Sequence, residues 1–249
     1  MIDDLPYVHT APLTDALDLT GVFANGLLGG TVARQHGLDL FGFVAVGLVS
    51  ALGGGIIRDV LLQAGPPAAL TDDLYIPVAL ASTLTAFLLN VGSQGRFESP
   101  GGRWSFTVVD AAALSTWALA GAQKTLATGL GWLPALLLGV VTAVGGGAIR
   151  DVLLRQVPAI FGGTGLYASV ALRVAGLGVL ANQLHVSAAG TVLGLAAGVT
   201  LKLVADRRGW YLPGGVDLRP GTGALNRRLR RGSASTDRGG AGWWRRRRG

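Results

Sequence analysis

A ten-residue segment occurs twice in this chain, 92 residues apart, and it constrains the fold more than any other feature of the sequence. Gly-Gly-Gly-Ile-Ile-Arg-Asp-Val-Leu-Leu at 53–62 is repeated as Gly-Gly-Gly-Ala-Ile-Arg-Asp-Val-Leu-Leu at 145–154. The same offset pairs further identical residues without a gap: Asp18 with Asp110, Gly29 with Gly121, Pro66 with Pro158, and Leu74-Tyr75 with Leu166-Tyr167. A gapless match over such a distance indicates an internal duplication, because chance rarely produces one.

The composition places this duplicated chain in a membrane. Half of its residues are hydrophobic, 14% are charged and the mean hydropathy is +0.48, whereas soluble domains carry about 25% charged residues. A disordered chain is excluded, and an ordinary soluble enzyme is not expected. The chain has no cysteine and three scattered histidines, so disulfide scaffolds, thiolate chemistry and the common metal sites are not expected. We expect no cofactor and no bound metal.

Seven stretches are long and apolar enough to form membrane helices, since about 20 apolar residues cross a bilayer. The predicted spans are 16–33, 39–62, 75–92, 105–123, 130–154, 165–182 and 186–204. Each copy of the duplication holds three spans, and an odd number inverts the second copy in the membrane. The sequence therefore predicts an all-α transmembrane fold of seven helices: two inverted three-helix repeats at 16–92 and 105–182, and a seventh helix at 186–204.

The positive charge is concentrated at the C-terminal end. Residues 206–249 hold twelve arginines against three aspartates, a net charge of +9, which leaves −2 for residues 1–205 out of the total of +7. We interpret 206–249 as a disordered cytoplasmic tail near anionic lipid headgroups, and we expect no nucleic-acid partner because the body has no basic face. Since basic loops stay on the inner side, residues 1–15 are predicted to be extracytoplasmic. The expected location is a bacterial inner (cell) membrane, and no signal peptide is expected.

Three consecutive glycines occur at the same place in the second span of each copy: Gly53, Gly54 and Gly55, and again Gly145, Gly146 and Gly147. Glycine costs about 1 kcal/mol relative to alanine inside a helix, and an opened backbone is tolerated in a membrane only where protein or water satisfies it. One interpretation is that helices two and five are broken here, beside a water-filled path. The other is that the glycines only allow close helix packing. We favour the break because charged residues follow it at fixed spacing in both copies.

The charged residues that follow the glycines are Arg58 and Asp59 in the first copy and Arg150 and Asp151 in the second. Charged groups at membrane depth are costly and usually face a bundle interior or an aqueous cavity. Because adjacent helical residues point about 100° apart, we expect each to pair with another helix rather than with its neighbour, and pairing between the two copies is one hypothesis. The alternative is an arginine that extends to the membrane surface beside an aspartate that caps the next turn.

Weaker signals come from other polar residues in the spans. Asp18 and Asp110 open repeat-related helices, where a carboxylate favours the positive helix end. Lys124 ends the fourth span; it either stabilises that helix end or moves with the membrane voltage, worth ~2.3 kcal/mol per 100 mV across the whole field. Arg173 lies inside the sixth span and needs a partner, for which Asp110 and Asp151 are candidates. The glycines match no phosphate-binding loop and no catalytic constellation is visible, so we predict that the chain is not an enzyme.

Together these residues resemble the bacterial trimeric intracellular cation (TRIC) channel family, also described as a tandem glycine transporter domain. The resemblance rests on the doubled Gly-Gly-Gly-x-x-Arg-Asp-Val-Leu-Leu, on Leu17-Asp18 at the start of the first span, and on Gly121-Ala122-Gln123-Lys124 at the end of the fourth. It covers residues 13–204, and the Arg-rich tail lies outside it.

The resemblance implies a homotrimer in which each protomer has its own pore for monovalent cations, mainly potassium. It implies that the helices with the glycine triplets line this pore. It also implies that Arg58 and Arg150 are the charges of the pathway, with Asp59 and Asp151 as their partners.

For such a pore we expect the hydroxyls of Ser50 and Thr142 to replace part of the ion's water shell, and the glycines to act as a hinge. The expected partners are potassium or sodium ions and membrane lipids. Two other functions remain open. A secondary transporter of a small amino acid such as glycine also fits an inverted repeat, with Arg58 holding the substrate carboxylate. The third is a membrane scaffold whose Arg-rich tail recruits a partner.

Overall fold

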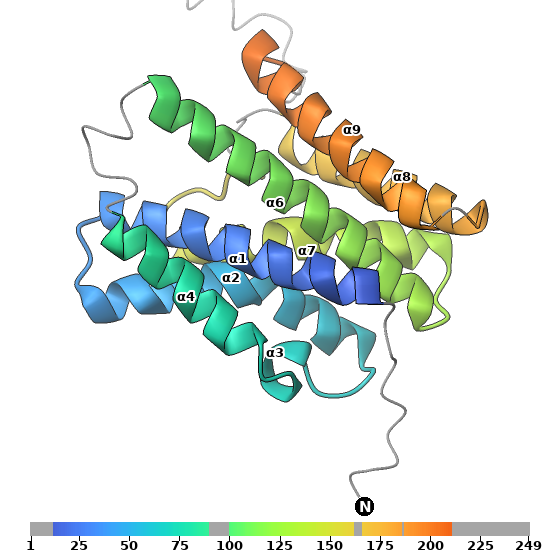
Figure 1. Ribbon diagram of the computed structural model, residues 1–249, viewed down its shortest axis with the longest axis horizontal. Coiled ribbons are helices and arrows are strands. Elements are labelled where there is room, and N and C mark those ends of the chain that lie inside the picture. The colour runs from blue at the N-terminus through green and yellow to red at the C-terminus, as the bar shows by residue number, and fades with distance from the viewer. Residues whose placement is uncertain (1–11, 90–99, 162–165, 186, 211–249) are drawn as a thin grey trace, which may run out of the picture. The chain divides into compact units, whose positions relative to one another are not determined.

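The computed structural model describes residues 12–89, 100–161, 166–185 and 187–210, and within these ranges the chain is helical, without a strand. The helices are α1 (Pro12–Gln35), α2 (Leu40–Leu62), α3 (Ala68–Thr71), α4 (Tyr75–Leu88), α6 (Pro100–Ala127), α7 (Trp132–Leu153), α8 (Tyr167–Gln183) and α9 (Ser187–Arg208) (Figure 1). The longer helices lie at the predicted spans, and α3 is a single turn between α2 and α4. Most of the predicted N-terminal segment 1–15 and of the tail lies outside the described residues.

Five of the described helices contain a segment long and apolar enough to cross a membrane: Thr14–Gln35, Leu40–Leu62, Gly101–Ala127, Trp132–Leu153 and Ala189–Arg208. The remaining long helices are shorter, with 14 residues in α4 and 17 in α8. Large apolar side chains lie on the outside of the bundle; Phe41 is 84% exposed and Leu193 is 68% exposed. Such a surface is expected where lipid or another protein subunit replaces water. The chain is therefore an all-helical membrane protein.

The duplication in the sequence recurs in the helices. α2 begins at Leu40 and α7 at Trp132, and α4 begins at Tyr75 and α8 at Tyr167, each pair 92 residues apart. α1, α2 and α4 contact one another, and so do α6, α7 and α8. Between these two sets α2 packs against α7 and α1 against α6, and α9 lies along α6 and α8 (Figure 1).

α2 and α7 remain helical through their glycine triplets, so the predicted break in helices two and five is wrong for this structure. A Cβ built on Gly53 would lie 3.3 Å from Cα of Gly146, and one on Gly145 would lie 3.3 Å from Cα of Gly54. A Cβ on Gly54 would also overlap the carbonyl oxygen of Thr142. The glycines therefore let two backbones touch where the helices cross, and no backbone hydrogen bond has to be opened.

The two hydroxyl residues predicted to line a path lie at this same crossing. Ser50 packs against Gly29 of α1, and Thr142 packs against Gly121 of α6. Both hydroxyl residues are buried. Thr142 donates its hydroxyl to the carbonyl of Leu138, whereas the Ser50 hydroxyl has no hydrogen-bond partner among the described residues.

The seventh helix is longer than predicted. α9 continues to Arg208, so the first residues assigned to the tail, which was predicted to begin at 206, are helical. Asp206 accepts two hydrogen bonds from Nζ of Lys202, one turn earlier, both at 2.8 Å. Oppositely charged residues four apart stabilise a helix, which explains the extension.

Candidate functional site

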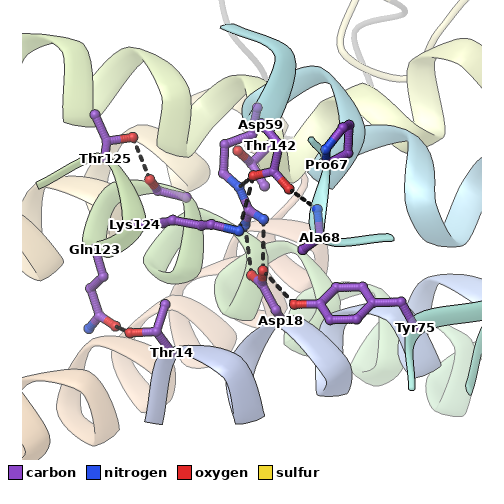
Figure 2. A network of polar contacts seen from close by, with 12 residues as sticks. Thr14, Asp18, Asp59, Pro67, Ala68, Tyr75, Gln123, Lys124, Thr125 and Thr142 are labelled. Carbon is purple, nitrogen blue, oxygen red and sulfur yellow. Dashed lines mark hydrogen bonds and ion pairs between the residues drawn. The ribbon is translucent and has the colours of Figure 1, made fainter. Parts of the chain in front are cut away.

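A first cluster of polar residues, consisting of Asp18, Arg58, Asp59, Tyr75 and Lys124, joins α1, α2, α4 and α6 (Figure 2). Arg58, near the end of α2, donates from Nη1 and Nη2 to the two carboxylate oxygens of Asp18 on α1, both at 2.7 Å. Tyr75, the first residue of α4, donates its hydroxyl to Asp18 at 3.1 Å. Asp18 is therefore the main partner of Arg58, a role beyond the helix-end effect expected from the sequence.

Asp59 completes the first cluster. Its Oδ1 accepts a hydrogen bond from Nε of Arg58 at 2.8 Å and lies 3.1 Å from Nζ of Lys124. Its Oδ2 accepts from the backbone N–H of Ala68 at 2.9 Å, at the start of α3. The prediction that Arg58 and Asp59 do not pair is wrong, because the long arginine side chain turns Nε back to its neighbour while its terminal nitrogens reach α1. The contact of Lys124 with Asp59 does join the two copies.

The first cluster is buried and its charges balance. The side chains of Arg58 and Asp18 are 0% and 1% exposed, and that of Lys124 is 19% exposed. Two cations face two carboxylates, so no net charge is left at membrane depth, where it would be costly. Removing one partner of a buried ion pair costs about 3–5 kcal/mol, because the other charge is left uncompensated. The first cluster therefore holds four helices together at one end of the bundle.

Trp117 on α6 fills the space beside the first cluster. Its side chain is fully buried, and the guanidinium carbon of Arg58 lies 5.8 Å from its ring centroid. A Cβ on Gly55 would lie 3.2 Å from the indole ring, and the pocket that these residues line has no room for a water molecule. The indole N–H has no hydrogen-bond partner among the described residues.

The related position in the other copy is filled differently. The offset of 92 relates Gly55 to Gly147, and it relates Trp117 to Asn25. A Cβ on Gly147 would meet only Nη2 of Arg150 within 4 Å, at 3.7 Å. The space beside Gly147 is therefore less tightly filled than the space beside Gly55, although the pocket that Gly147 lines is only about 10 Å³.

A second cluster lies toward the other end of α6, since Asp110 and Lys124 are ~21 Å apart along that helix at 1.5 Å per residue. It consists of Asp110, Arg150, Asp151, Tyr167, Lys202 and Asp206. Arg150 donates from Nε and Nη2 to one oxygen of Asp151, at 2.9 and 2.7 Å, and the N–H of Ala159 donates to the other at 3.2 Å. These contacts repeat the arrangement around Asp59, so the prediction that neighbouring Arg and Asp do not pair is wrong in the second copy as well.

The rest of the second cluster departs from the repeat. Tyr167 donates to Asp110 at 3.0 Å, but within the described residues no hydrogen bond or ion pair joins Arg150 to Asp110. Lys202 of α9 binds Asp206 and lies 5.2 Å from the Tyr167 ring centroid. The two hydrogen bonds by which Arg58 holds Asp18 in the first cluster therefore have no counterpart between Arg150 and Asp110 in the second.

A partly open cavity of about 360 Å³ lies beside the second cluster. Its polar lining includes Asp110, Arg150, Tyr167, Lys202 and Asp206. The two ends of the bundle thus differ: one is dry and filled by Trp117, and the other has room for water and small solutes.

Arg173 belongs to neither cluster. It lies on the exposed face of α8 beside Leu172 and Leu177, which are 49% and 40% exposed. Among the residues that the structure describes it makes no ion pair, so the expected pairing with Asp110 or Asp151 is not found.

Sequence reasoning did not single out Tyr75, Tyr167, Lys202 and Asp206 as members of the clusters, or Trp117 beside the first cluster. A signal existed for three of them. The 92-residue offset pairs Tyr75 with Tyr167, two hydroxyl groups kept at the start of an apolar helix, and it sets Trp117 against Asn25, a large departure from the repeat.

The chain is similar to proteins of known family. A family model described as glycine transporter matches twice, over residues 15–90 and 107–183, which correspond to the two three-helix sets. The inner membrane protein YadS of Escherichia coli K12 is 32% identical over 205 residues, 79% of this chain and 92% of YadS. A membrane protein of Deinococcus radiodurans is 37% identical over 161 residues, 64% of this chain and 72% of the relative.

Solved structures agree with these matches. A structure that addresses conductance through TRIC cation channels has a TM-score of 0.72 at 28% identity, over 82% of this chain and 98% of the other. The TRIC trimeric intracellular cation channel orthologue from Rhodobacter sphaeroides has a TM-score of 0.67 at 30% identity, over 80% of this chain and 97% of the other. The shared duplication, helix arrangement and sequence place this chain in the TRIC channel family.

Proposed function

We propose that the chain is a monovalent cation channel of the bacterial inner membrane, selective for potassium and assembled as a homotrimer with one pore in each protomer. The observation that carries the proposal is its likeness to a solved TRIC cation channel over 98% of that chain's length. We assign it no enzymatic activity and no cofactor.

The proposed path runs from the cavity at the second cluster, along the crossing of α2 and α7, to the first cluster. The glycine triplets bring the two helices together there, and Ser50 and Thr142 supply hydroxyl groups. The buried Ser50 hydroxyl supports this path because it has no partner among the described residues, and such groups usually find one in water or an ion. The path is closed in this conformation because no space for water remains beside Arg58 and Trp117.

A positive charge in a cation path would repel the ion unless it were neutralised. Nε, Nη1 and Nη2 of Arg58 each donate to a carboxylate, so we assign Arg58 the role of a lock that holds α1 and α2 together. Lys124, with a side chain 19% exposed, is the most exposed charged member of the first cluster, and we propose it as the charge that responds to voltage. A full crossing of the field would supply ~2.3 kcal/mol per 100 mV.

We further propose seven membrane crossings, with the N-terminus outside and the Arg-rich tail inside, near anionic headgroups. The 17 residues of α8 extend ~26 Å at 1.5 Å per residue, close to the ~30 Å of a hydrocarbon core. α4 is shorter, but its predicted span continues to residue 92. Arg34 lies in the last turn of α1 and Arg155 follows the end of α7. Both are on the side proposed for the tail, which agrees with the retention of basic loops on the inner side. Under this orientation the first cluster faces outside and the second cluster faces the cytoplasm.

The direct test is single-channel recording from the purified protein in a planar bilayer under a potassium chloride gradient. Discrete openings that reverse near the potassium equilibrium potential are expected. The trimer should be verified by size-exclusion chromatography with light scattering on the same sample. Silence across the voltage range from an intact trimer would overturn the proposal.

A second candidate, a secondary transporter for a small amino acid, is favoured by one observation. The cavity at the second cluster is lined by both Arg150 and Asp110, the opposite charges that a zwitterion needs. Arg58, expected from the sequence to hold a substrate carboxylate, is occupied by Asp18 and Asp59. Saturable uptake of labelled glycine into proteoliposomes, without unitary currents, would establish the transporter instead of the channel.

A further inference from the structure

We propose that Asp110 and the hydroxyl of Tyr167 form a binding site for one monovalent cation in the cavity at the second cluster. The proposal rests on the proposed channel function and deepens it, because it names the place where an ion is held before the narrow part of the path. It follows from a difference in charge balance between two clusters that the duplication relates.

The first cluster has no charge left over. Arg58 donates two hydrogen bonds of 2.7 Å to the carboxylate of Asp18. Asp59 is shared by Arg58 and Lys124, at 2.8 and 3.1 Å. The two positive and two negative groups compensate one another, and no water fits beside Arg58. The first cluster itself therefore has neither a net charge that would attract a cation nor room for one beside Arg58.

The second cluster has one carboxylate left over. Arg150 directs Nε and Nη2 to Asp151, and Nζ of Lys202 lies 2.8 Å from both oxygens of Asp206. Each of these cations therefore already has its own carboxylate. Asp110, the counterpart of Asp18, receives only the Tyr167 hydroxyl at 3.0 Å within the described part of the chain. The second cluster holds three carboxylates and two cations, a formal net charge of −1, and Asp110 is the carboxylate that makes no ion pair with the described residues.

The cavity provides the room and the ligand chemistry for a hydrated cation. Its volume is about 360 Å³, compared with about 30 Å³ for one molecule of liquid water, so an ion can keep most of its water shell. Alkali cations prefer oxygen ligands. Tyr167 donates its proton to Oδ1 of Asp110, which leaves the phenol oxygen lone pairs and the second carboxylate oxygen for the ion.

An anion is the less suitable occupant, although Arg150 and Lys202 line the same cavity. Both are compensated at contact distance by Asp151 and Asp206. An anion would therefore meet the net negative charge of Asp110, while a cation is attracted by it.

The first test is binding of thallium(I), a potassium analogue, to the detergent-solubilised full chain by isothermal titration calorimetry. One site per protomer is expected in the wild type, lost in Asp110→Asn and retained in Asp110→Glu. Asparagine keeps the shape and the acceptor for Tyr167, so an unchanged melting temperature is expected. Asp73→Asn, in an exposed position of the loop before α4, is the matched control for removal of a carboxylate. Thallium binding that survives Asp110→Asn would overturn the site.

The second test separates the site from the channel function. The single-channel conductance of Asp110→Asn should fall about five-fold at 50 mM potassium chloride, the effect of one charge near 4 Å in water, and should approach wild type at 1 M, where salt screens the charge. Unchanged conductance at 50 mM would overturn a role of the site in conduction. A silent wild type that still binds thallium through Asp110 would support the site and overturn the channel.

Discussion

At the scale of single residues, the closed end of the bundle depends on Arg58 and Trp117. Arg58 donates to carboxylates on its own helix and on α1, and its guanidinium lies over the Trp117 ring at 5.8 Å. Both side chains are fully buried. Changes at either residue should therefore affect stability and closure together, and variants that separate these effects are the informative ones.

Arg58→Met is expected to destabilise the protein by about 3–5 kcal/mol, because the buried carboxylate of Asp18 loses its counter-charge. Adding Asp18→Leu should recover part of this loss, since the double variant leaves neither charge of that pair unpaired. Thermal denaturation in detergent, followed by size-exclusion chromatography of the surviving trimer, measures the effect. Strictly additive losses would show that the two residues do not act as a pair.

Trp117→Asn, which copies the related Asn25 of the first copy, is expected to raise the open probability at 0 mV. The smaller polar side chain admits water beside Gly55, where the indole ring now leaves no space. Trp117→Phe keeps an aromatic ring at the same place and serves as the control. Planar-bilayer recordings at fixed protein density measure the open probability of both variants. Equal open probabilities in the Asn and Phe variants would contradict the idea that the ring of Trp117 keeps the path closed.

At the scale of helices, the crossing of α2 and α7 separates two roles of glycine. A Cβ on Gly54 would overlap the Thr142 carbonyl oxygen, whereas a Cβ on Gly147 would meet only the tip of Arg150 at 3.7 Å. Alanine favours a helix over glycine by about 1 kcal/mol at both positions. The pair Gly54→Ala and Gly147→Ala thus distinguishes close packing from hinge bending.

We expect Gly54→Ala to lower the melting temperature, because the helices must move apart. Gly147→Ala should raise the melting temperature slightly, because alanine favours the helix and meets no clash, and it should lower the open probability, since a stiffer α7 bends less easily. Melting curves and single-channel recordings on the same preparations test both statements. Normal gating of Gly147→Ala would leave close packing as the only role of the glycines and end the hinge hypothesis.

The same crossing shows why part of the fold follows from the sequence and part does not. The starts of α2 and α7 are predictable because hydropathy and the 92-residue offset report on one helix at a time. The continuity of these helices is not, because a glycine triplet lowers the cost of both opening a helix and bringing a second one close. Which effect prevails depends on the distance to a helix 92 residues away in the chain, which no local pattern encodes.

The members of the two clusters are likewise predictable from the sequence only in part. The duplicated Arg-Asp pairs mark their places, but Asp18 and Arg58 are 40 residues apart in the sequence and meet only through helix packing. Lys202 comes from α9, which lies outside the duplication, so comparison of the two copies does not reveal it. The repeat predicts what the two ends share, and the difference between them comes from Trp117 and α9.

At the scale of the whole molecule, the proposed orientation can be tested directly because the chain contains no cysteine. Asp73→Cys, in the loop before α4, is expected to react with a membrane-impermeant maleimide on intact spheroplasts. Phe161→Cys, at a residue 77% exposed in the loop after α7, should react only after permeabilisation. The reverse pattern would place the Arg-rich tail outside.

The difference in net charge between the two clusters also predicts in which direction the channel conducts better. Under the proposed orientation the second cluster, with a formal net charge of −1 and its cavity of about 360 Å³, collects cations at the cytoplasmic mouth, while the neutral first cluster collects none. In symmetric 0.1 M potassium chloride, where charges act over about 10 Å, outward current should therefore exceed inward current at equal voltage. The difference should shrink at 1 M, where the screening length is about 3 Å, and disappear in Asp110→Asn. The orientation of the channel in the bilayer is determined by adding a maleimide polymer to one chamber, since it blocks Phe161→Cys channels only when the cytoplasmic side faces that chamber. Larger inward currents in molecules oriented this way would show that the outer end, and not Asp110, supplies the ions.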